Sequence, residues 1–130
     1  MTPIKTILLC DDELHILRAA EFKFQRAGFR VLCAEDGEDG WELMQDHLPD
    51  VVVTDLQMPR LDGIGLAERM KHDPRTAQIP VVMVTAKGYE ISAEEYRERY
   101  GIRQVLHKPF SPRELMRTVE QILQETPLST

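Results

Sequence analysis

The sequence predicts a single α/β domain in which a doubly wound, five-stranded parallel sheet lies between two layers of helices. Short runs rich in β-branched residues alternate five times with stretches whose apolar residues recur at helical spacing. The chain has 130 residues, 42% hydrophobic and 29% charged, which is typical of one globular domain. Strands that alternate with helices pair in parallel, with helices covering both faces. We expect one domain over residues 1–130, with a core at about 5–124 and a loose tail at 125–130.

Five short apolar runs are the predicted strands. They are expected at Lys5–Cys10, Phe29–Ala34, Val51–Thr54, Ile79–Val84 and Arg103–His107. The last run has fewer apolar residues than the others, which indicates an edge strand. Right-handed crossovers leave few arrangements for five such units, and we expect the doubly wound order 2-1-3-4-5.

Five amphipathic stretches are the predicted helices. They are Glu13–Ala27, a segment with Trp41, Met44 and Leu48 on one face, Gly63–His72, Ser92–Arg99 and a helix that starts after Ser111. Gly28 stands where a helix C-cap belongs, and Pro49 ends the second helix. Ser111 as N-cap with Glu114 three residues later is typical of a helix start.

Composition excludes several classes of function. The formal net charge of −6 and a pI near 5.2 argue against direct nucleic-acid binding, which needs clustered Lys and Arg. No apolar run approaches the roughly 20 residues that a membrane span requires, and the N-terminus lacks a signal-peptide core. Cys10 and Cys33 lie inside apolar runs, as reduced core cysteines do. We therefore expect a cytoplasmic protein without direct contact to membranes or nucleic acid.

Polar residues stand at the ends of four predicted strands. In an open parallel sheet, ligands bind beyond the carboxyl ends of the strands where the strand order reverses, here between the first and third strands. Asp11, Asp12 and Asp55 follow these two strands. Three ionised carboxylates in one place repel each other unless a cation is present, and a hard divalent ion such as Mg²⁺ suits oxygen ligands. Thr85 and Lys108 end the fourth and fifth strands, which completes a set suited to phosphoryl transfer onto a carboxylate.

These motifs resemble the receiver domain of two-component response regulators of the chemotaxis-regulator type, which has a flavodoxin-like sheet. The residues that carry the resemblance are Asp11-Asp12, the segment DLQMPRLDG at Asp55–Gly63, Thr85-Ala86 and Lys108-Pro109-Phe110. The resemblance extends from about residue 5 to residue 124. It covers nearly the whole chain, and the combination of motifs is highly specific.

The resemblance implies a role for each motif residue. Asp55 would be the phosphoacceptor. The Mg²⁺ ligands would be Asp11, through water, Asp12, Asp55 and the backbone carbonyl of Gln57. The groups that hold the phosphoryl oxygens would be the Thr85 hydroxyl, the Ala86 backbone N–H and the Lys108 ammonium. The Lys108–Pro109 peptide bond would be cis.

The implied function is that of a phosphorylation-operated signalling switch. A sensor histidine kinase or phosphotransfer protein would supply the phosphoryl group. The altered surface would act on an unidentified output partner or on an output domain outside this chain. Only self-phosphorylation and self-dephosphorylation are expected, so the protein would not be an enzyme in the usual sense.

The sequence departs from the family at the output face. Val105 stands where relatives commonly have a Tyr or Phe that rotates on activation, and a Val has no ring to rotate. Arg103-Gln104 stands where many relatives have acidic residues that pair across a symmetric dimer. We therefore expect activation through displacement of the loop Thr85–Glu90, and no stable homodimer through this face.

Two other functions share the predicted fold. A flavin mononucleotide protein needs a phosphate-binding loop rich in Ser, Thr or Gly after the first strand, and Asp11-Asp12-Glu13 would repel that phosphate. A Mg²⁺-dependent phosphohydrolase with an Asp nucleophile is the nearer alternative. It usually needs a cap or insertion that forms a substrate pocket, and the chain has no such segment. Turnover of excess phosphomonoester would distinguish this hydrolase from a switch.

Overall fold

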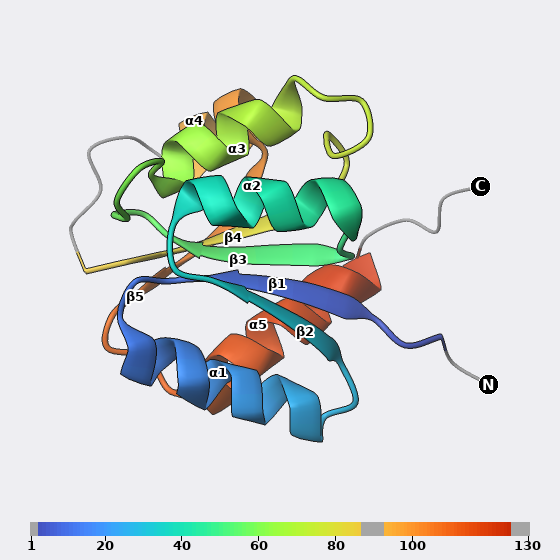
Figure 1. Cartoon of the computed structure of the whole chain (residues 1–130), viewed down its shortest axis with the longest axis vertical. Coiled ribbons are helices and arrows are strands. Elements are labelled where there is room, and N and C mark those ends of the chain that lie inside the picture. The colour runs from blue at the N-terminus through green and yellow to red at the C-terminus, as the bar shows by residue number, and fades with distance from the viewer. Residues whose placement is uncertain (1–2, 87–92, 126–130) are drawn as a thin grey trace.

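A computed structural model, which describes residues 3–86 and 93–125, has the predicted three-layer α/β fold (Figure 1). In these residues one sheet is formed by β1 Thr6–Cys10, β2 Arg30–Ala34, β3 Val51–Asp55, β4 Val81–Thr85 and β5 Ile102–His107. All neighbouring strands are parallel, in the order β2-β1-β3-β4-β5. This order confirms the prediction and leaves β5 at an edge.

Helices cover both faces of the sheet (Figure 1). One face carries α1 Leu14–Arg26 and α5 Pro112–Glu125, and the other carries α2 Gly37–Asp46, α3 Gly63–Lys71 and α4 Ala93–Tyr100. Gly28 ends α1 with a φ of 94°, which glycine adopts without a steric penalty. The Glu114 N–H donates to the Ser111 hydroxyl at 3.0 Å, so the predicted N-cap of α5 is confirmed.

The second helix is shorter than its apolar spacing predicts. Met44 is buried and Trp41 packs against the same cluster, as expected. However, α2 ends at Asp46, and His47 has a non-helical backbone with φ −139° and ψ 81°. Leu48 therefore lies beyond the helix and is 50% exposed, so its predicted place on the inward face was wrong. Pro49 explains the difference, because a residue that precedes proline is disfavoured in helical conformation.

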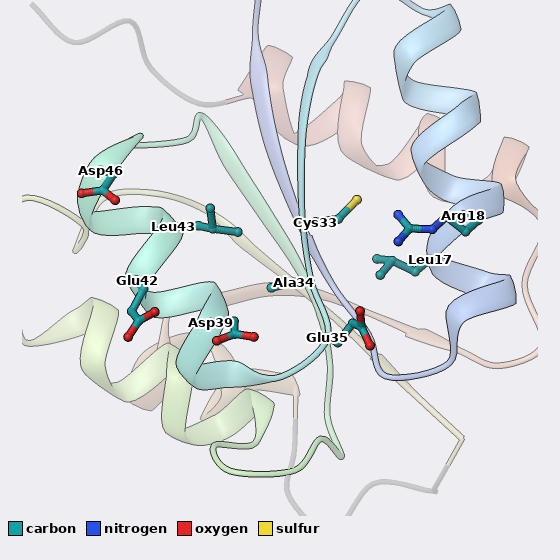
Figure 2. A pocket seen from close by; sticks show the side chains of 9 residues that line it. All are labelled: Leu17, Arg18, Cys33, Ala34, Glu35, Asp39, Glu42, Leu43 and Asp46. Carbon is teal, nitrogen blue, oxygen red and sulfur yellow. The ribbon is translucent and has the colours of Figure 1, made fainter.

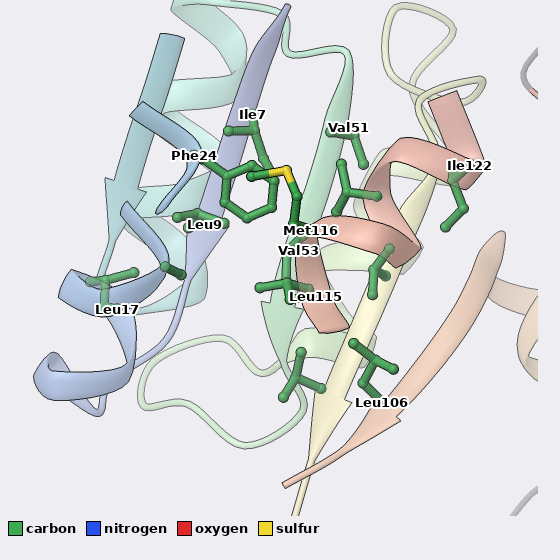
Figure 3. Close-up of a cluster of buried hydrophobic side chains, with 14 residues drawn as sticks. Ile7, Leu9, Leu17, Phe24, Val51, Val53, Leu106, Leu115, Met116 and Ile122 are labelled. Atoms are coloured by element: carbon green, nitrogen blue, oxygen red, sulfur yellow. The ribbon is translucent and has the colours of Figure 1, made fainter. Parts of the chain in front are cut away.

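The core consists of two apolar clusters, one on each face of the sheet. Ile7 and Leu9 pack toward α1 and α5 (Figure 3), whereas Leu8 packs toward α2 and α3. Val52 and Val53 divide between the same two clusters. Each such aliphatic side chain contributes about 1.5–3 kcal/mol when it is fully buried. The sheet is therefore a rigid support for the residues that follow β1 and β3.

The two cysteines are part of this core. Cys10 and Cys33 are free thiols on adjacent strands, where Leu9 rather than Cys10 pairs with Cys33 in the register. Cys10 belongs to the cluster under α2 and α3, and Cys33 packs against the cluster under α1 and α5. Their packing agrees with the expectation of core thiols. Within residues 3–86 and 93–125, no helix is both long enough and apolar enough to cross a membrane.

Candidate functional site

Three carboxylates meet where β1 and β3 end. Asp11 and Asp12 directly follow β1, and Asp55 is the last residue of the neighbouring strand β3. One carboxylate oxygen from each residue lies within 4.8 Å of the other two. Asp11 and Asp55 are each 6% exposed, whereas Asp12 is exposed to solvent. The fold thus brings together the three acids that the strand pattern predicted at one edge.

This cluster is electrostatically unfavourable without a cation. Burial and the charge of Asp11 raise the pKa of Asp55 to about 6, although the nearby Lys108 ammonium opposes the shift. Burial also raises the pKa of Asp11, against the Glu13 N–H and Lys108, which favour its ionised form. Both carboxylates would therefore gain stability from a bound cation. Three oxygen ligands on one open edge fit a hard divalent ion that keeps several water ligands.

Lys108 supplies the positive charge beside the cluster. Its Nζ lies 3.2 Å from Asp11 Oδ2 and 3.4 Å from Asp55 Oδ2, and its side chain is 9% exposed. Burial alone would lower the pKa of Lys108, but the hydrogen bond to Glu13 and the two aspartates hold it above its usual value. The backbone N–H of Lys108 donates to the Thr85 carbonyl at 2.9 Å, and the bond to Pro109 is cis, as the resemblance implied. The ammonium is therefore a fixed charge of the site.

Glu13 is a fourth carboxylate at the site, which sequence reasoning did not assign. Its Oε1 accepts a hydrogen bond from Lys108 Nζ at 3.0 Å, and its backbone N–H donates to Asp11 Oδ1 at 2.9 Å. The sequence signal that could have indicated it is the acidic run Asp11-Asp12-Glu13. The contact with Lys108 joins residues 95 positions apart, and no local pattern indicates it.

The residues predicted to hold phosphoryl oxygens lie at the same edge. Thr85 ends β4, which neighbours β3, and is 2% exposed, whereas Ala86 is exposed. The Leu56 N–H donates to the Val84 carbonyl at 2.8 Å and joins the ends of these two strands. Gln57 is exposed in the loop after β3. Residues 87–90, which are most of the loop Thr85–Glu90 predicted to move on activation, lie outside the described residues.

The loop between β3 and α3 packs tightly beneath the acidic cluster. A Cβ at Gly63 would lie 2.4 Å from the Asp55 carbonyl oxygen, so only glycine fits there. Arg60 has a φ of 69°, in the left-handed region. Its guanidinium lies 3.2 Å from the Asp36 carboxylate at the start of α2. These contacts fix the loop that carries Gln57.

The predicted output face has a basic groove. Val105 is partly buried and packs against the apolar cluster under α2 and α3. Arg97 of α4 and Arg103 of β5 line a groove of about 370 Å³ together with Gln104 and residues of α5, of which Glu125 is acidic. Two guanidinium groups in this groove agree with the basic character that the sequence predicted for this face.

A second groove of about 370 Å³ lies between α1 and α2, over β2 (Figure 2). Its wall on α2 carries the acidic side chains of Asp39, Glu42 and Asp46, and Arg18 faces them from α1. None of the three clustered aspartates lines it. The groove is therefore separate from the candidate site.

A doubly wound parallel sheet with an acidic cluster and a lysine at its carboxyl edge agrees with the arrangement that the resemblance to a phosphoacceptor signalling domain implied. The response regulator receiver domain family matches residues 7–120. This chain belongs to that family. The comparisons give no support to the phosphohydrolase alternative.

Three similar proteins illustrate the relationship. The phosphate regulon transcriptional regulatory protein PhoB of Pseudomonas aeruginosa is 38% identical over 122 residues, which are 94% of this chain and 53% of PhoB. A response regulator structure from Chloroflexus aurantiacus J-10-fl has 33% identity and a TM-score of 0.84, with 95% of this chain and all of that chain covered.

The third is the receiver domain of the sensor histidine kinase PA1611 from Pseudomonas aeruginosa PAO1. It has 23% identity and a TM-score of 0.81, with 95% of this chain and all of that chain covered. That structure has a magnesium ion coordinated in its active site cleft. This chain spans about half the length of the curated regulators that it matches.

Proposed function

We propose that this chain is a single receiver domain, residues 1–130, in which Asp55 accepts the phosphoryl group. The observation that carries the proposal is the position of Asp55. Its carboxylate lies at the end of β3, within 4.8 Å of ligand atoms of Asp11 and Asp12 and 3.4 Å from the Lys108 ammonium. Asp55 is the acid with a pKa of about 6 at the centre of this cluster, so it is largely ionised and nucleophilic at neutral pH.

The proposed donor is a phosphohistidine on a sensor kinase or phosphotransfer protein. An Asp55 carboxylate oxygen attacks the phosphorus, an oxygen–phosphorus bond forms, and the phosphorus–nitrogen bond to the donor imidazole breaks. The imidazole nitrogen leaves with the electron pair and takes up a proton. Positioning and charge neutralisation are the main contributions of the protein to such a transfer.

Asp11, Asp12 and Asp55, with the backbone carbonyl of Gln57, are the proposed ligands of Mg²⁺. The cation would neutralise charge on the carboxylates and on the transferred phosphoryl group. The oxygen-only ligand set supports this choice, as does the magnesium ion in the structurally similar PA1611 receiver domain.

The Thr85 hydroxyl, the Ala86 N–H and the Lys108 ammonium are the proposed partners of the phosphoryl oxygens. Thr85 and Lys108 are joined by a backbone hydrogen bond of 2.9 Å between neighbouring strand ends. A shift of Thr85 toward the phosphoryl group would therefore be transmitted to Lys108 at the end of β5, and along the chain to the loop after β4. Val105 has no aromatic ring, so this loop rather than a rotating side chain carries the change.

The proposed protein is a signalling domain, not a multiple-turnover enzyme, and it works in the cytoplasm. The two free core thiols support a reducing compartment. Its output partner is another protein or a domain outside this chain, and no direct nucleic-acid contact is proposed, because the net charge is −6.

Intact-mass analysis after incubation with acetyl phosphate and Mg²⁺ tests the proposal. One phosphate per chain is expected for the wild type and none for Asp55→Asn. Labelling of Asp55→Asn at the wild-type rate would refute the assignment. Sustained release of phosphate from excess phosphomonoester would instead support a hydrolase.

A further inference from the structure

Lys108 contacts three carboxylates, and one of them has no part in the proposed phosphoryl transfer. The Nζ atom lies 3.0 Å from Glu13, 3.2 Å from Asp11 and 3.4 Å from Asp55. An ammonium group has three N–H donors. Three carboxylates therefore surround these donors. The shortest of the three contacts is with Glu13, which accepts a hydrogen bond from Nζ.

Glu13 occupies the N-cap position of α1, but its side chain does not cap the helix. Its backbone is extended, with φ −88° and ψ 101°, and the side chain makes no capping hydrogen bond. The carboxylate instead reaches across to Lys108. Glu13 is 46% exposed, whereas the Lys108 side chain is 9% exposed. Its carboxylate therefore acts on the direction of the ammonium rather than on the start of the helix.

We propose that Glu13 is a positioning residue that holds Lys108 before phosphorylation and thereby restrains the reaction at Asp55. The inference rests on the proposed function of Asp55 and Lys108. A donor that points to Glu13 is withheld from the incoming phosphoryl oxygens. Loss of this carboxylate releases one N–H of Lys108 for the reaction.

The same carboxylate has the opposite effect on a metal ion. Glu13 adds negative charge to the edge where Asp11, Asp12 and Asp55 lie, and this charge attracts a cation. It also draws Lys108 away from Asp11 and Asp55. Without Glu13, and before a phosphoryl donor binds, the ammonium would pair more fully with those two aspartates and compete with Mg²⁺ for them. Removal of Glu13 should therefore weaken Mg²⁺ binding.

The test compares Glu13→Gln with the wild type in two measurements. Phosphorylation by acetyl phosphate at saturating Mg²⁺ should be about two- to fivefold faster in the variant. Mg²⁺ affinity, measured by calorimetry without phosphodonor, should be about two- to fivefold weaker. These ranges are those of a partly exposed charge pair. Glu21→Gln is the matched control, because Glu21 lies on the same helix but pairs with Arg18 at 2.8 Å. It should change neither quantity.

The substitution Glu13→Asp separates positioning from charge. It keeps the negative charge, but its side chain is one methylene shorter and should not reach Lys108. If Glu13 acts through its contact with Lys108, the Asp variant should be phosphorylated as fast as the Gln variant. A wild-type rate in the Asp variant would assign the effect to charge alone and overturn the proposal. An unchanged or slower rate in Glu13→Gln would also overturn it. Labelling of Asp55→Asn in either background would refute the proposed function itself.

Discussion

Replacing Asp55 with Asn should make the metal-free protein more stable above about pH 6. The Asp55 pKa is about 6 in the folded protein, compared with about 3.9 in an unfolded chain. The folded state therefore binds the proton more tightly than the unfolded state does. Stability falls as the pH rises from about 4 to about 6, and it stays reduced at higher pH. Asparagine has nearly the same shape and carries no charge, so the variant avoids this loss.

The pKa difference sets the size of the effect. Two pKa units correspond to about 3 kcal/mol, since each unit is about 1.4 kcal/mol. This is an upper limit, because the cluster lies at an edge of the sheet where Asp12 is exposed and solvent weakens the repulsion. The Asp55 pKa of about 6 already includes the attraction of Lys108, so no further correction for that charge is needed. We therefore expect a gain of about 1–3 kcal/mol for Asp55→Asn at about pH 7.5.

Urea unfolding in EDTA, at about pH 4 and about pH 7.5, measures this gain. The stability difference between Asp55→Asn and the wild type should be large at the higher pH and near zero at the lower one. Asp46→Asn is the control, since Asp46 is exposed on α2 and outside the cluster, and should change stability by no more than about 0.5 kcal/mol. A loss of stability in Asp55→Asn at about pH 7.5, or a gain that does not depend on pH, would refute the reasoning.

Three further predictions concern the metal, the loop after β3 and the output face. Millimolar Mg²⁺ should raise the wild-type melting temperature, and Asp12→Ala should abolish the rise in a thermal-shift assay, because a ligand of the folded state is lost. Gly63→Ala should lower the free energy of unfolding by about 2 kcal/mol or more, because its Cβ would collide with the Asp55 carbonyl; equal stability in urea would contradict this packing. With beryllofluoride and Mg²⁺ the protein should sediment as a monomer, and a tight dimer through Arg103 and Gln104 would contradict the expectation from this basic face.

The sequence predicted the fold and most of the site because both depend on local patterns. Strand β3 is a run of valines that is buried on both faces, and such a run has few other interpretations. Once the sheet is parallel, the residues after β1 and β3 must meet at one edge. The positions of Asp11, Asp12 and Asp55 therefore follow from the strand order alone.

The features that the sequence did not predict depend on contacts between distant segments. Glu13 looks like an ordinary acidic residue at a helix start, and its contact with Lys108 appears only when the fold brings the two residues together. Arg60 has a left-handed backbone that arginine rarely adopts. Its contact with Asp36 joins the loop between β3 and α3 to the start of α2. Leu48 continues a helical spacing, yet the helix ends before it. In each case a tertiary or neighbouring-residue effect outweighs the local pattern.

The rigidity of the core determines how the charge repulsion at the site can be relieved. Val52 and Thr54 in β3 have no exposed surface, and Gly63 packs against the Asp55 backbone with no room for a Cβ, so close packing resists separation of the strand ends. Above the Asp55 pKa of about 6, a cation or a redirected Lys108 can lower the energy of the three carboxylates. A difference of about 1–3 kcal/mol is enough to shift a two-state equilibrium by about 5- to 150-fold. The stability that the cluster costs the resting fold is therefore of the size that the proposed metal binding and phosphorylation would need to operate it as a switch.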